Sequence, residues 1–439
     1  MNAPRMTVIG TGYLGLTHAV CLAEMGHEVL AIDVDKAKIA MAARGEVPFF
    51  EPGLEPLLRK NLDTGRLRFA TSYEAIAAFG DVHFLCVGTP QAEAGQADLS
   101  HVYSAIRGLA PHLTRECLIV GKSTVPVGTA RRVLAELHQL APAGDQVDLA
   151  WNPEFLREGF AVQDSLAPDR LVFGVTSGAA AELLHKVYAK PIATRTPTLV
   201  MDLETAELVK VAANAFLATK ISFINVMAEM CEVTGADVIR LAEALGHDQR
   251  IGRRFLSPGL GFGGGCLPKD IRALAVTAAS FGVTSLTSLL GTVDTINLGR
   301  RERVAHLARQ ATGGDLAGKR VAVLGVAFKP NSDDVRDSPS LDICERLAGE
   351  GAAVAVHDPV AMPSAAAKRP DLHYASSVSE AAAGADLVLH LTEWSDYQAI
   401  DPAALATIVS QPTIIDARCA LDVELWRAAG WAVHVLGRP

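Results

Sequence analysis

Cys266 is the side chain in this sequence best suited to covalent chemistry. It follows the glycine-rich run Gly-Leu-Gly-Phe-Gly-Gly-Gly, residues 259–265, and precedes Leu-Pro-Lys-Asp. So many glycines suit a loop whose backbone presses against a ligand, because each glycine loses extra entropy on ordering. Pro268 is favoured as the first residue of a helix, which places Cys266 at that helix's N-terminus, where the helix end and Lys269 favour the thiolate. We predict that Cys266 is a nucleophile with Asp270 near the same face; a buried, inert cysteine is the alternative.

Lys210 and Asn214 form a second candidate pair. They are four residues apart in a predicted helix over residues 202–233, so they share one face, and the rest of that face is apolar. A half-buried lysine is readily perturbed and could stabilise an oxyanion or alkoxide. A solvated or salt-bridged lysine is the alternative.

A glycine turn near the N-terminus predicts a dinucleotide site. The turn Gly-Thr-Gly-Tyr-Leu-Gly, residues 10–15, lies between a predicted strand and a helix. Gly10 allows the tight turn, Gly12 lets the backbone approach a pyrophosphate at the helix N-terminus, and Gly15 permits close helix packing. Asp33 ends the next strand, where a carboxylate accepts from the ribose hydroxyls and repels a 2′-phosphate, which favours NAD. A flavin site or a nucleotide-free relic is the alternative.

Three polar segments follow other predicted strands. They are Val87–Pro90, Lys122–Pro126 and Asn152–Gly159. Ligands bind outside the carboxyl ends of strands in an open parallel sheet, so all three segments face the expected nicotinamide crevice. Ordinary turn chemistry would explain any one of them alone.

The elements that must position these residues predict an α/β fold: two Rossmann-like parallel-sheet domains joined by a central all-helical segment that contains a long helix. Short apolar strands alternate with helices over residues 6–195 and again over 319–439, whereas residues 202–300 show no strand pattern. We expect three domains: a dinucleotide-binding domain over residues 1–199, a helical domain over 200–312 and a second parallel-sheet domain over 313–439.

Composition excludes several classes. The 439 residues are 49% hydrophobic and 20% charged, which is too apolar for a disordered chain. The net charge is −9 with scattered Lys and Arg, so neither nucleic acid nor a membrane surface is the expected partner. No apolar run approaches the ~18–20 residues that span a bilayer, and no secretory signal is evident at Met1–Arg5. The odd number of cysteines, seven, indicates cytoplasmic free thiols, and no metal site is expected.

Over essentially its full length the chain resembles the UDP-glucose/GDP-mannose dehydrogenases. A cysteine in a glycine loop before Pro-Lys-Asp, with Leu-Val-Lys-Val-Ala-Ala-Asn upstream, is highly specific for this family. The matching stretches are Gly10–Gly15, Cys86–Pro90, Lys122–Gly128, Asn152–Gly159, Glu207–Asn225, Gly261–Asp270 and Gly325–Pro339.

The resemblance implies a four-electron oxidation of a nucleotide-sugar C6 alcohol to a carboxylate with two NAD per turnover. Cys266 would add to the intermediate aldehyde, and the thiohemiacetal would become a thioester that water hydrolyses. Lys210 and Asn214 would stabilise the negative oxygen, Asp270 would support proton transfer, and Glu154 with Thr124 would position or activate water.

The resemblance also implies binding residues and an assembly. Cofactor contacts would come from Gly10, Gly12, Tyr13, Leu14, Gly15, Asp33, Lys38, Thr89, Thr124, Glu158 and Arg336. Substrate contacts to a small-molecule UDP-sugar would come from Glu154, Phe155, Leu156, Lys210, Asn214, Arg250, Phe255, Leu256, Ser257, Gly259, Gly263, Cys266, Phe328, Lys329 and Arg418. Arg250 matches an arginine that reaches across a subunit boundary, which implies a homodimer or a larger homo-oligomer through the long helix. The segment after Arg320–Leu324 lacks the glycine fingerprint, so a second dinucleotide is not expected there.

Three departures from the family pattern matter. Gly265 stands where serine is usual and could loosen the loop, and Trp151 stands where a small residue is usual. The stretch Asp-Ala-Arg-Cys, residues 416–419, alters an Asp-Gly-Arg-Asn pattern, so Arg418 is a weaker assignment than Lys329.

Other substrates within this family and other functions outside it remain as alternatives. The glycine loop and Gln249–Gly252 are more similar to the UDP-glucose branch than to the GDP-mannose branch, and a UDP-N-acetyl-hexosamine is a third substrate. A two-electron alcohol dehydrogenase with a structural Cys266 would release an aldehyde. A non-catalytic NAD-sensing module would need none of Lys210, Asn214, Cys266 and Asp270.

Overall fold

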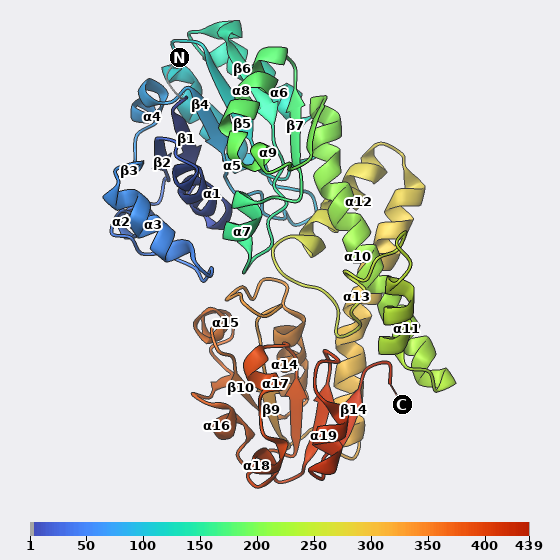
Figure 1. The fold of residues 1–439 in the computed structure, drawn as a ribbon. Helices are drawn as coiled ribbons and strands as arrows, with labels where there is room; N and C mark the ends of the chain where they lie inside the picture. Colours follow the sequence, from blue (N-terminus) through green and yellow to red (C-terminus); the bar gives the residue numbers. More distant parts are fainter. Residues whose placement is uncertain (1–3, 439) are drawn as a thin grey trace. The chain divides into compact units, whose positions relative to one another are not determined.

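The computed structural model describes residues 4–438 and divides into two compact units. The first unit ends at Ala213 and the second begins at Asn214 (Figure 1). Met1–Ala3, the first three residues of the N-terminal segment in which no secretory signal is expected, lie outside the described residues.

An eight-stranded sheet forms the centre of the first unit. In sheet order its strands are β3 (Leu67–Ala70), β2 (Val29–Ile32), β1 (Met6–Ile9), β4 (Val82–Leu85), β5 (Cys117–Gly121), β6 (Val147–Trp151), β7 (Leu171–Val175) and β8 (Thr198–Met201). The pairs are parallel except β6–β7, which is antiparallel. Chain order reverses between β1 and β4, and this switch point is where an open α/β sheet holds its ligand.

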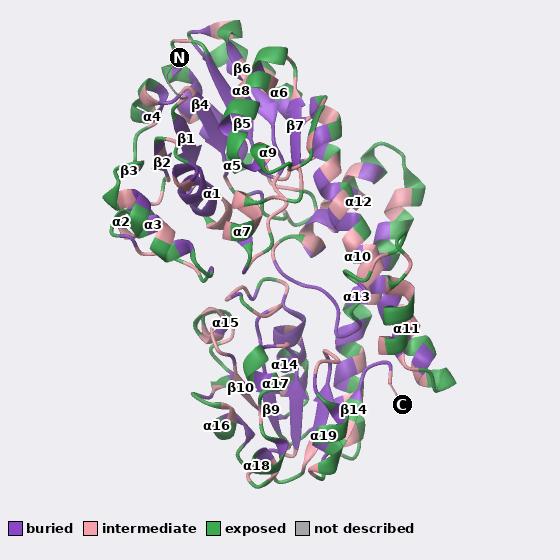
Figure 2. Ribbon diagram, viewed as in Figure 1, coloured by how far each residue is buried: buried purple, intermediate pink, exposed green. Residues whose placement is uncertain are grey.

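Helices cover both faces of this sheet, so its central strands are buried apolar runs. Apolar residues of α1, α3 and α8 pack in one core cluster, and those of α4, α5 and α6 pack in another. Figure 2 shows the buried strands between exposed helix surfaces. The helices are α1 (Tyr13–Glu24), α2 (Lys36–Ala43), α3 (Leu54–Asp63), α4 (Tyr73–Phe79), α5 (Ser100–Leu109), α6 (Thr129–Leu140), α7 (Ala161–Leu166), α8 (Gly178–Val187) and α9 (Ala189–Ala193).

Residues 202–300 contain helices and loops, and, as the sequence predicts, no strand lies between β8 and β9 in the described chain. The helices are α10 (Leu203–Thr234), α11 (Val238–Gly246), α12 (Leu267–Ser280) and α13 (Thr284–Ala311). The boundary between the two units falls within α10, which is 32 residues long. Gly264 and Gly261 have positive φ in the loop before α12, which explains why this segment is neither helix nor strand.

A parallel six-stranded sheet organises the rest of the second unit. In sheet order its strands are β11 (His373–Tyr374), β10 (Ala353–His357), β9 (Arg320–Leu324), β12 (Leu387–His390), β13 (Thr413–Asp416) and β14 (Ala432–Val435). Its helices are α14 (Pro339–Gly349), α15 (Met362–Lys368), α16 (Val378–Ala382), α17 (Ser395–Gln398), α18 (Pro402–Ala406) and α19 (Val423–Ala428). Buried residues of α13 and α14 join those of β9 and β12 in one core.

The predicted fold class is confirmed. β3, β8 and β11 escape the pattern because they are short and partly exposed edge strands with weak apolar periodicity. The antiparallel β6–β7 pair departs from the all-parallel expectation for the first sheet.

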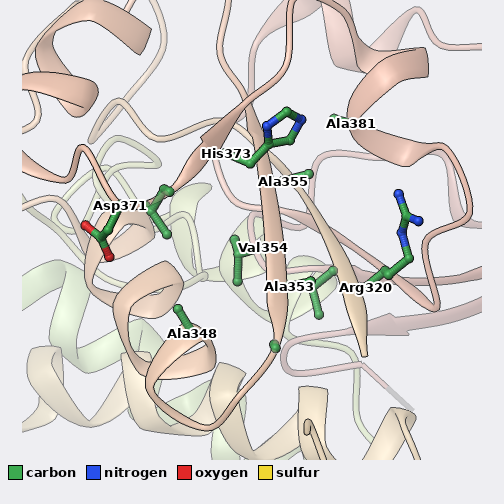
Figure 3. Close-up of a pocket in the computed structure, with 11 residues that line it drawn as sticks. Arg320, Ala348, Ala353, Val354, Ala355, Asp371, His373 and Ala381 are labelled. Carbon is green, nitrogen blue, oxygen red and sulfur yellow. The ribbon is translucent and has the colours of Figure 1, made fainter. Parts of the chain in front are cut away.

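Two other features of the described chain complete the fold. By length and composition α10 could cross a membrane, but 44% of its apolar stretch is buried, and core helices of soluble proteins pass the same test. A cavity of about 390 Å³ lies beside β10 and is lined mainly by alanine and valine, with Arg320, Asp371 and His373 among its polar residues (Figure 3). It contains none of the predicted site residues.

Candidate functional site

The glycine turn has the geometry of a phosphate cradle. Gly10 has φ +92° and lies so close to Cys86 that a Cβ would be 3.0 Å from the Cys86 carbonyl oxygen. A Cβ on Gly15 would overlap the carbonyl oxygen of Gly10, whereas a Cβ on Gly12 would meet no atom within 4 Å. Asp33 is half-buried, and its carboxylate accepts from the backbone N–H of Thr11 at 2.7 Å. The turn can therefore accept a pyrophosphate over Gly12, and these residues fit NAD.

Tyr13 links this turn to the segment after β6. Its hydroxyl donates to the buried carboxylate of Glu51, which also accepts from the backbone N–H groups of Gly159 and Ala161, both at 2.7 Å. Burial, followed by the hydrogen bond to Glu51, raises the pKa of Tyr13. Glu51 was not among the predicted residues, since a lone carboxylate before Pro-Gly carries no pattern. It positions the segment that contains the predicted cofactor residue Glu158.

The three polar strand-end segments are joined by hydrogen bonds. The Thr89 hydroxyl donates to the carbonyl oxygen of Thr124 at 2.9 Å, and the Ser123 hydroxyl donates to that of Val87 at 2.6 Å. The Trp151 indole N–H donates to the carbonyl oxygen of Ser123 at 3.2 Å. The expectation that these segments share one sheet edge is met, and Trp151 has a buried structural role there.

Lys210 and Glu154 form a buried ion pair. The Lys210 Nζ is 3.0 Å from Glu154 Oε1, and the two side chains are 5% and 13% exposed. The other carboxylate oxygen of Glu154 accepts from the backbone N–H of Leu156 at 2.6 Å. The ring centroid of Phe155 is 5.7 Å from Lys210 Nζ. A salt-bridged lysine, the alternative considered above, is therefore what the chain contains, and its partner is itself a predicted site residue.

Cys266 is exposed and caps α12. It is the N-cap residue, Leu267 is the first helical residue, and Pro268 follows in the first turn. Helix N-termini favour an anion, so this thiol lies where a thiolate is stabilised. Burial raises the pKa of Cys86, Cys21 and Cys344 to about 12. The contrast singles out Cys266 for nucleophilic chemistry.

Asp270 is held next to the cysteine by its own helix. Its backbone N–H donates to the carbonyl oxygen of Cys266 at 2.9 Å, and its carboxylate is 2% exposed. The Asn214 amide donates to one carboxylate oxygen at 2.7 Å, and Lys269 Nζ pairs with the other at 2.6 Å. Asn214, Asp270 and Cys266 are thus brought together within the second unit, and Lys269 pairs with Asp270.

The glycines before Cys266 make room for the segment after β9. A Cβ on Gly264 would be 2.8 Å from the Phe328 ring, and one on Gly265 would lie 2.6 Å or less from the Arg336 guanidinium nitrogens. Gly264 N–H donates to the carbonyl oxygen of Arg336 at 2.9 Å. Gly265 therefore does not simply loosen the loop, as its departure from serine suggested, because Arg336 occupies the space of a side chain. Arg336 itself pairs with Asp334 at 2.7 Å.

Arg418 ties three loops together. Its guanidinium donates to the carbonyl oxygens of Leu391 at 2.7 Å, Phe328 at 3.0 Å and Gly261 at 3.2 Å. It also lies 3.2 Å from a carboxylate oxygen of Glu393. This arginine positions the predicted nucleotide loops, and its donors are largely committed to them. Lys329 directly follows Phe328, whose carbonyl oxygen Arg418 contacts, and is half-buried.

Several of the remaining predicted residues lie together in one loop. Leu256, Gly259 and Gly263 are buried in the loop that follows α11, and Phe255 and Ser257 are exposed there. Gly259 N–H donates to the Asn225 side chain at 2.9 Å. Two further predicted residues pair with nearby carboxylates: the Arg250 side chain is 88% exposed and pairs with Asp248, and the Lys38 Nζ is 3.9 Å from Asp35.

Within the described residues, no group of three or more histidine, cysteine or carboxylate side chains could hold a metal ion.

Comparisons with known proteins assign the chain to a family. Three models of the UDP-glucose/GDP-mannose dehydrogenase family match: the NAD binding domain over residues 4–192, the central domain over 204–298 and the UDP binding domain over 322–423. A UDP-glucose 6-dehydrogenase of Rhizobium meliloti is 41% identical over 99% of this chain and 100% of its own length. One of Pseudomonas aeruginosa is 40% identical over 99% of this chain and 98% of its own length.

Solved structures agree with this assignment. A UDP-glucose dehydrogenase from Pyrobaculum islandicum superposes with a TM-score of 0.92 at 37% identity, covering 100% of this chain and 98% of that one. A UDP-D-ManNAc dehydrogenase from Pyrococcus horikoshii gives a TM-score of 0.87 at 26% identity, covering 99% of each chain. The chain belongs to the UDP-glucose/GDP-mannose dehydrogenase family.

Proposed function

We propose that this protein is a UDP-glucose 6-dehydrogenase that converts UDP-glucose to UDP-glucuronate with two NAD per turnover. The observation that carries the proposal is the exposed Cys266 at the N-terminus of α12, in a chain that full-length UDP-glucose 6-dehydrogenases match at about 41% identity. Bound NAD would accept one hydride in each of the two oxidations.

The cysteine explains how an alcohol is oxidised twice. The first oxidation leaves an aldehyde, whose carbon has no hydride to give until a nucleophile makes it tetrahedral. The Cys266 thiolate adds to that carbon, forming a C–S bond and an alkoxide that is protonated to the thiohemiacetal. Loss of the remaining hydride and the hydroxyl proton gives a thioester. Water then attacks the thioester carbon, the C–S bond breaks, and the carboxylate and the free thiol are released.

The neighbouring groups supply charge and proton transfer. In this proposal Lys210 and Asn214 stabilise the negative oxygen as it develops, because an ammonium and an amide both donate hydrogen bonds to it. Asp270 accepts or returns a proton near the sulfur. Glu154, already fixed by Leu156 N–H and Lys210, positions the hydrolytic water together with Thr124.

Binding of the UDP-sugar is proposed for the loops that the glycines and Arg418 organise. Lys329 is the proposed diphosphate contact, and the backbone around Leu256–Gly259 would enclose the nucleotide. Arg418 supports this loop arrangement through its carbonyl contacts. Arg336 and the Gly10–Gly15 turn are proposed for NAD.

We also propose a homodimer formed through α10. Phe216, Phe223 and Met230 recur every seven residues on this helix and are 67%, 49% and 56% exposed. An apolar stripe of this kind is unusual on a free helix and is suited to packing against a second copy.

The free thiols of all seven cysteines are consistent with the proposed cytoplasmic location.

Product stoichiometry tests the function. With UDP-glucose and excess NAD, we expect two NADH per sugar consumed and UDP-glucuronate as the product by mass spectrometry. Cys266→Ser should stall after aldehyde or covalent-adduct formation, whereas Cys231→Ser, at a buried cysteine of the same unit, should keep the stoichiometry. One NADH per sugar with aldehyde release would instead identify a two-electron dehydrogenase. Preference for GDP-mannose or UDP-N-acetylmannosamine would overturn the substrate.

A further inference from the structure

Lys122 is a buried lysine with only neutral hydrogen-bond partners. It follows β5 directly and is 6% exposed. Its Nζ donates to the Asn152 side-chain oxygen at 3.0 Å and lies 3.4 Å from both the Asn152 carbonyl oxygen and the Tyr188 hydroxyl. A buried ammonium without a carboxylate in hydrogen-bond contact is costly, so its retention calls for a role.

Asn152 connects Lys122 to the Glu154–Lys210 pair. The Tyr188 hydroxyl donates to the same Asn152 oxygen at 2.6 Å, and the Asn152 amide donates to the carbonyl oxygen of Val172 at 2.9 Å. The side chain of Asn152 is therefore fixed on both sides. Only Pro153 separates it from Glu154, so the network sets the course of the chain into Glu154.

Charged and titratable groups surround Lys122 on every side. These are His18 from α1, Cys86 after β4, Glu154 after β6, Tyr188 after α8 and Lys210 from α10. Burial lowers the pKa of Lys122 to about 8, which Cys86 and Glu154 partly offset and Lys210 reinforces. The Lys122 side chain is thus within electrostatic range of both Glu154 and Lys210.

We propose that Lys122 is a positioning residue that fixes Glu154 through Asn152 and whose buried charge supports the Glu154–Lys210 pair. The proposal rests on the proposed function for the roles of Glu154 and Lys210. An apolar side chain could fill the same space, so packing alone does not account for an ammonium at this position.

The pH–rate profile separates this role from packing. Lys122→Met and Lys122→Gln remove the charge, and the Gln variant keeps a donor for Asn152. Loss of a buried positive charge lets neighbouring groups hold their protons to higher pH, so both limbs of the kcat profile should move up by about one unit. At pH 7 we expect kcat to fall at least tenfold with a smaller change in KM for UDP-glucose.

Tyr188→Phe is the matched control. It removes a hydroxyl from the same network but keeps the ammonium, so it should lower the melting temperature and leave both limbs in place. If both limbs of the kcat–pH profile stay in place in either folded Lys122 variant, Lys122 has only a packing role and the proposal is overturned. The proposed function is tested separately, by the NADH stoichiometry of the wild-type protein. If the wild-type protein does not yield two NADH per UDP-glucose, the proposed function is rejected, whatever the pH profiles of the Lys122 variants show.

Discussion

Two glycines of the same turn should respond to alanine in opposite ways. Gly15→Ala should destabilise the first unit, whereas Gly12→Ala should spare its stability and weaken NAD binding. The difference comes from what a Cβ meets: at Gly15 it overlaps the Gly10 carbonyl oxygen and lies 2.9 Å from the Gly10 carbonyl carbon, and at Gly12 it meets nothing within 4 Å.

The magnitudes follow from these surroundings. Relief at Gly15 requires movement of backbone, so the cost should reach the upper end of overpacking, about 3 kcal/mol. That corresponds to roughly 6–12 °C in Tm for a unit of this size. Gly12 has φ −69° and ψ −168°, which alanine adopts without strain, so its stability change should stay within about 1 kcal/mol. A methyl between the turn and a pyrophosphate should remove about one charged hydrogen bond, ~1.5–3 kcal/mol, or about 10- to 100-fold in affinity.

Calorimetry of unfolding and titration of NAD check both halves of this prediction. Wild-type NAD affinity in Gly12→Ala would show that the pyrophosphate does not lie over this turn. An unchanged Tm in Gly15→Ala would refute the packing argument.

Two further predictions concern α10. Burial raises the pKa of Glu207 to about 7 although its carboxylate accepts from Gly128 and Ala130 N–H, both at 2.6 Å. The folded state then holds a proton that the unfolded state loses above about pH 4.5, so the free energy of unfolding should fall by up to ~3 kcal/mol as pH rises from about 4.5 to 7. Glu207→Gln should flatten that slope in urea titrations at pH 5 and pH 7.5, and an equal slope in both proteins would contradict it. Phe216→Asp should shift the chain towards monomer by sedimentation, whereas Val34→Asp, 85% exposed on the first unit, should not; unchanged mass for Phe216→Asp would argue against dimerisation through α10.

The sequence alone is enough to predict the position of a residue where that position depends on its immediate neighbours in the chain. The Gly10–Gly15 turn could be predicted because strand, glycines and helix are contiguous, and Cys266 could be placed at a helix start because Pro268 follows it. The central helices could be predicted because long apolar periodicity outweighs local exceptions.

Contacts between distant segments could not be predicted in this way. Nothing near Glu51 indicates that it accepts from Tyr13 and from Gly159, 108 residues later, and nothing near Lys122 reveals Asn152 and Tyr188. Gly265 illustrates the same limit, since its consequence depends on Arg336, which only the folded chain brings there. These partners depend on the register of the sheets, which single-segment patterns do not encode.

The first six strands of the larger sheet follow the strand order of the smaller sheet, but the two sheets should bind only one NAD per chain. In each unit a carboxylate ends the strand next to the first strand, Asp33 after β2 and Asp358 after β10. Asp33 is half-buried and retains access to a ligand, whereas Asp358 is fully buried and accepts from Val326, Ala327, Val360 and Ala361 N–H and from the Trp394 indole.

A carboxylate saturated by its own turn has no lone pair left for ribose hydroxyls. In addition, Ala327 follows Gly325 by two residues where Gly12 follows Gly10, so the turn after β9 carries a Cβ at the position that is bare in the turn after β1. Titration calorimetry should therefore give one NAD per chain, and Asp33→Ala should abolish that binding while Asp358→Asn, which disturbs the donors, should lower the Tm. A stoichiometry of two, or NAD binding that survives loss of Asp33 and fails on loss of Asp358, would show that the saturated carboxylate is not what separates the two domains.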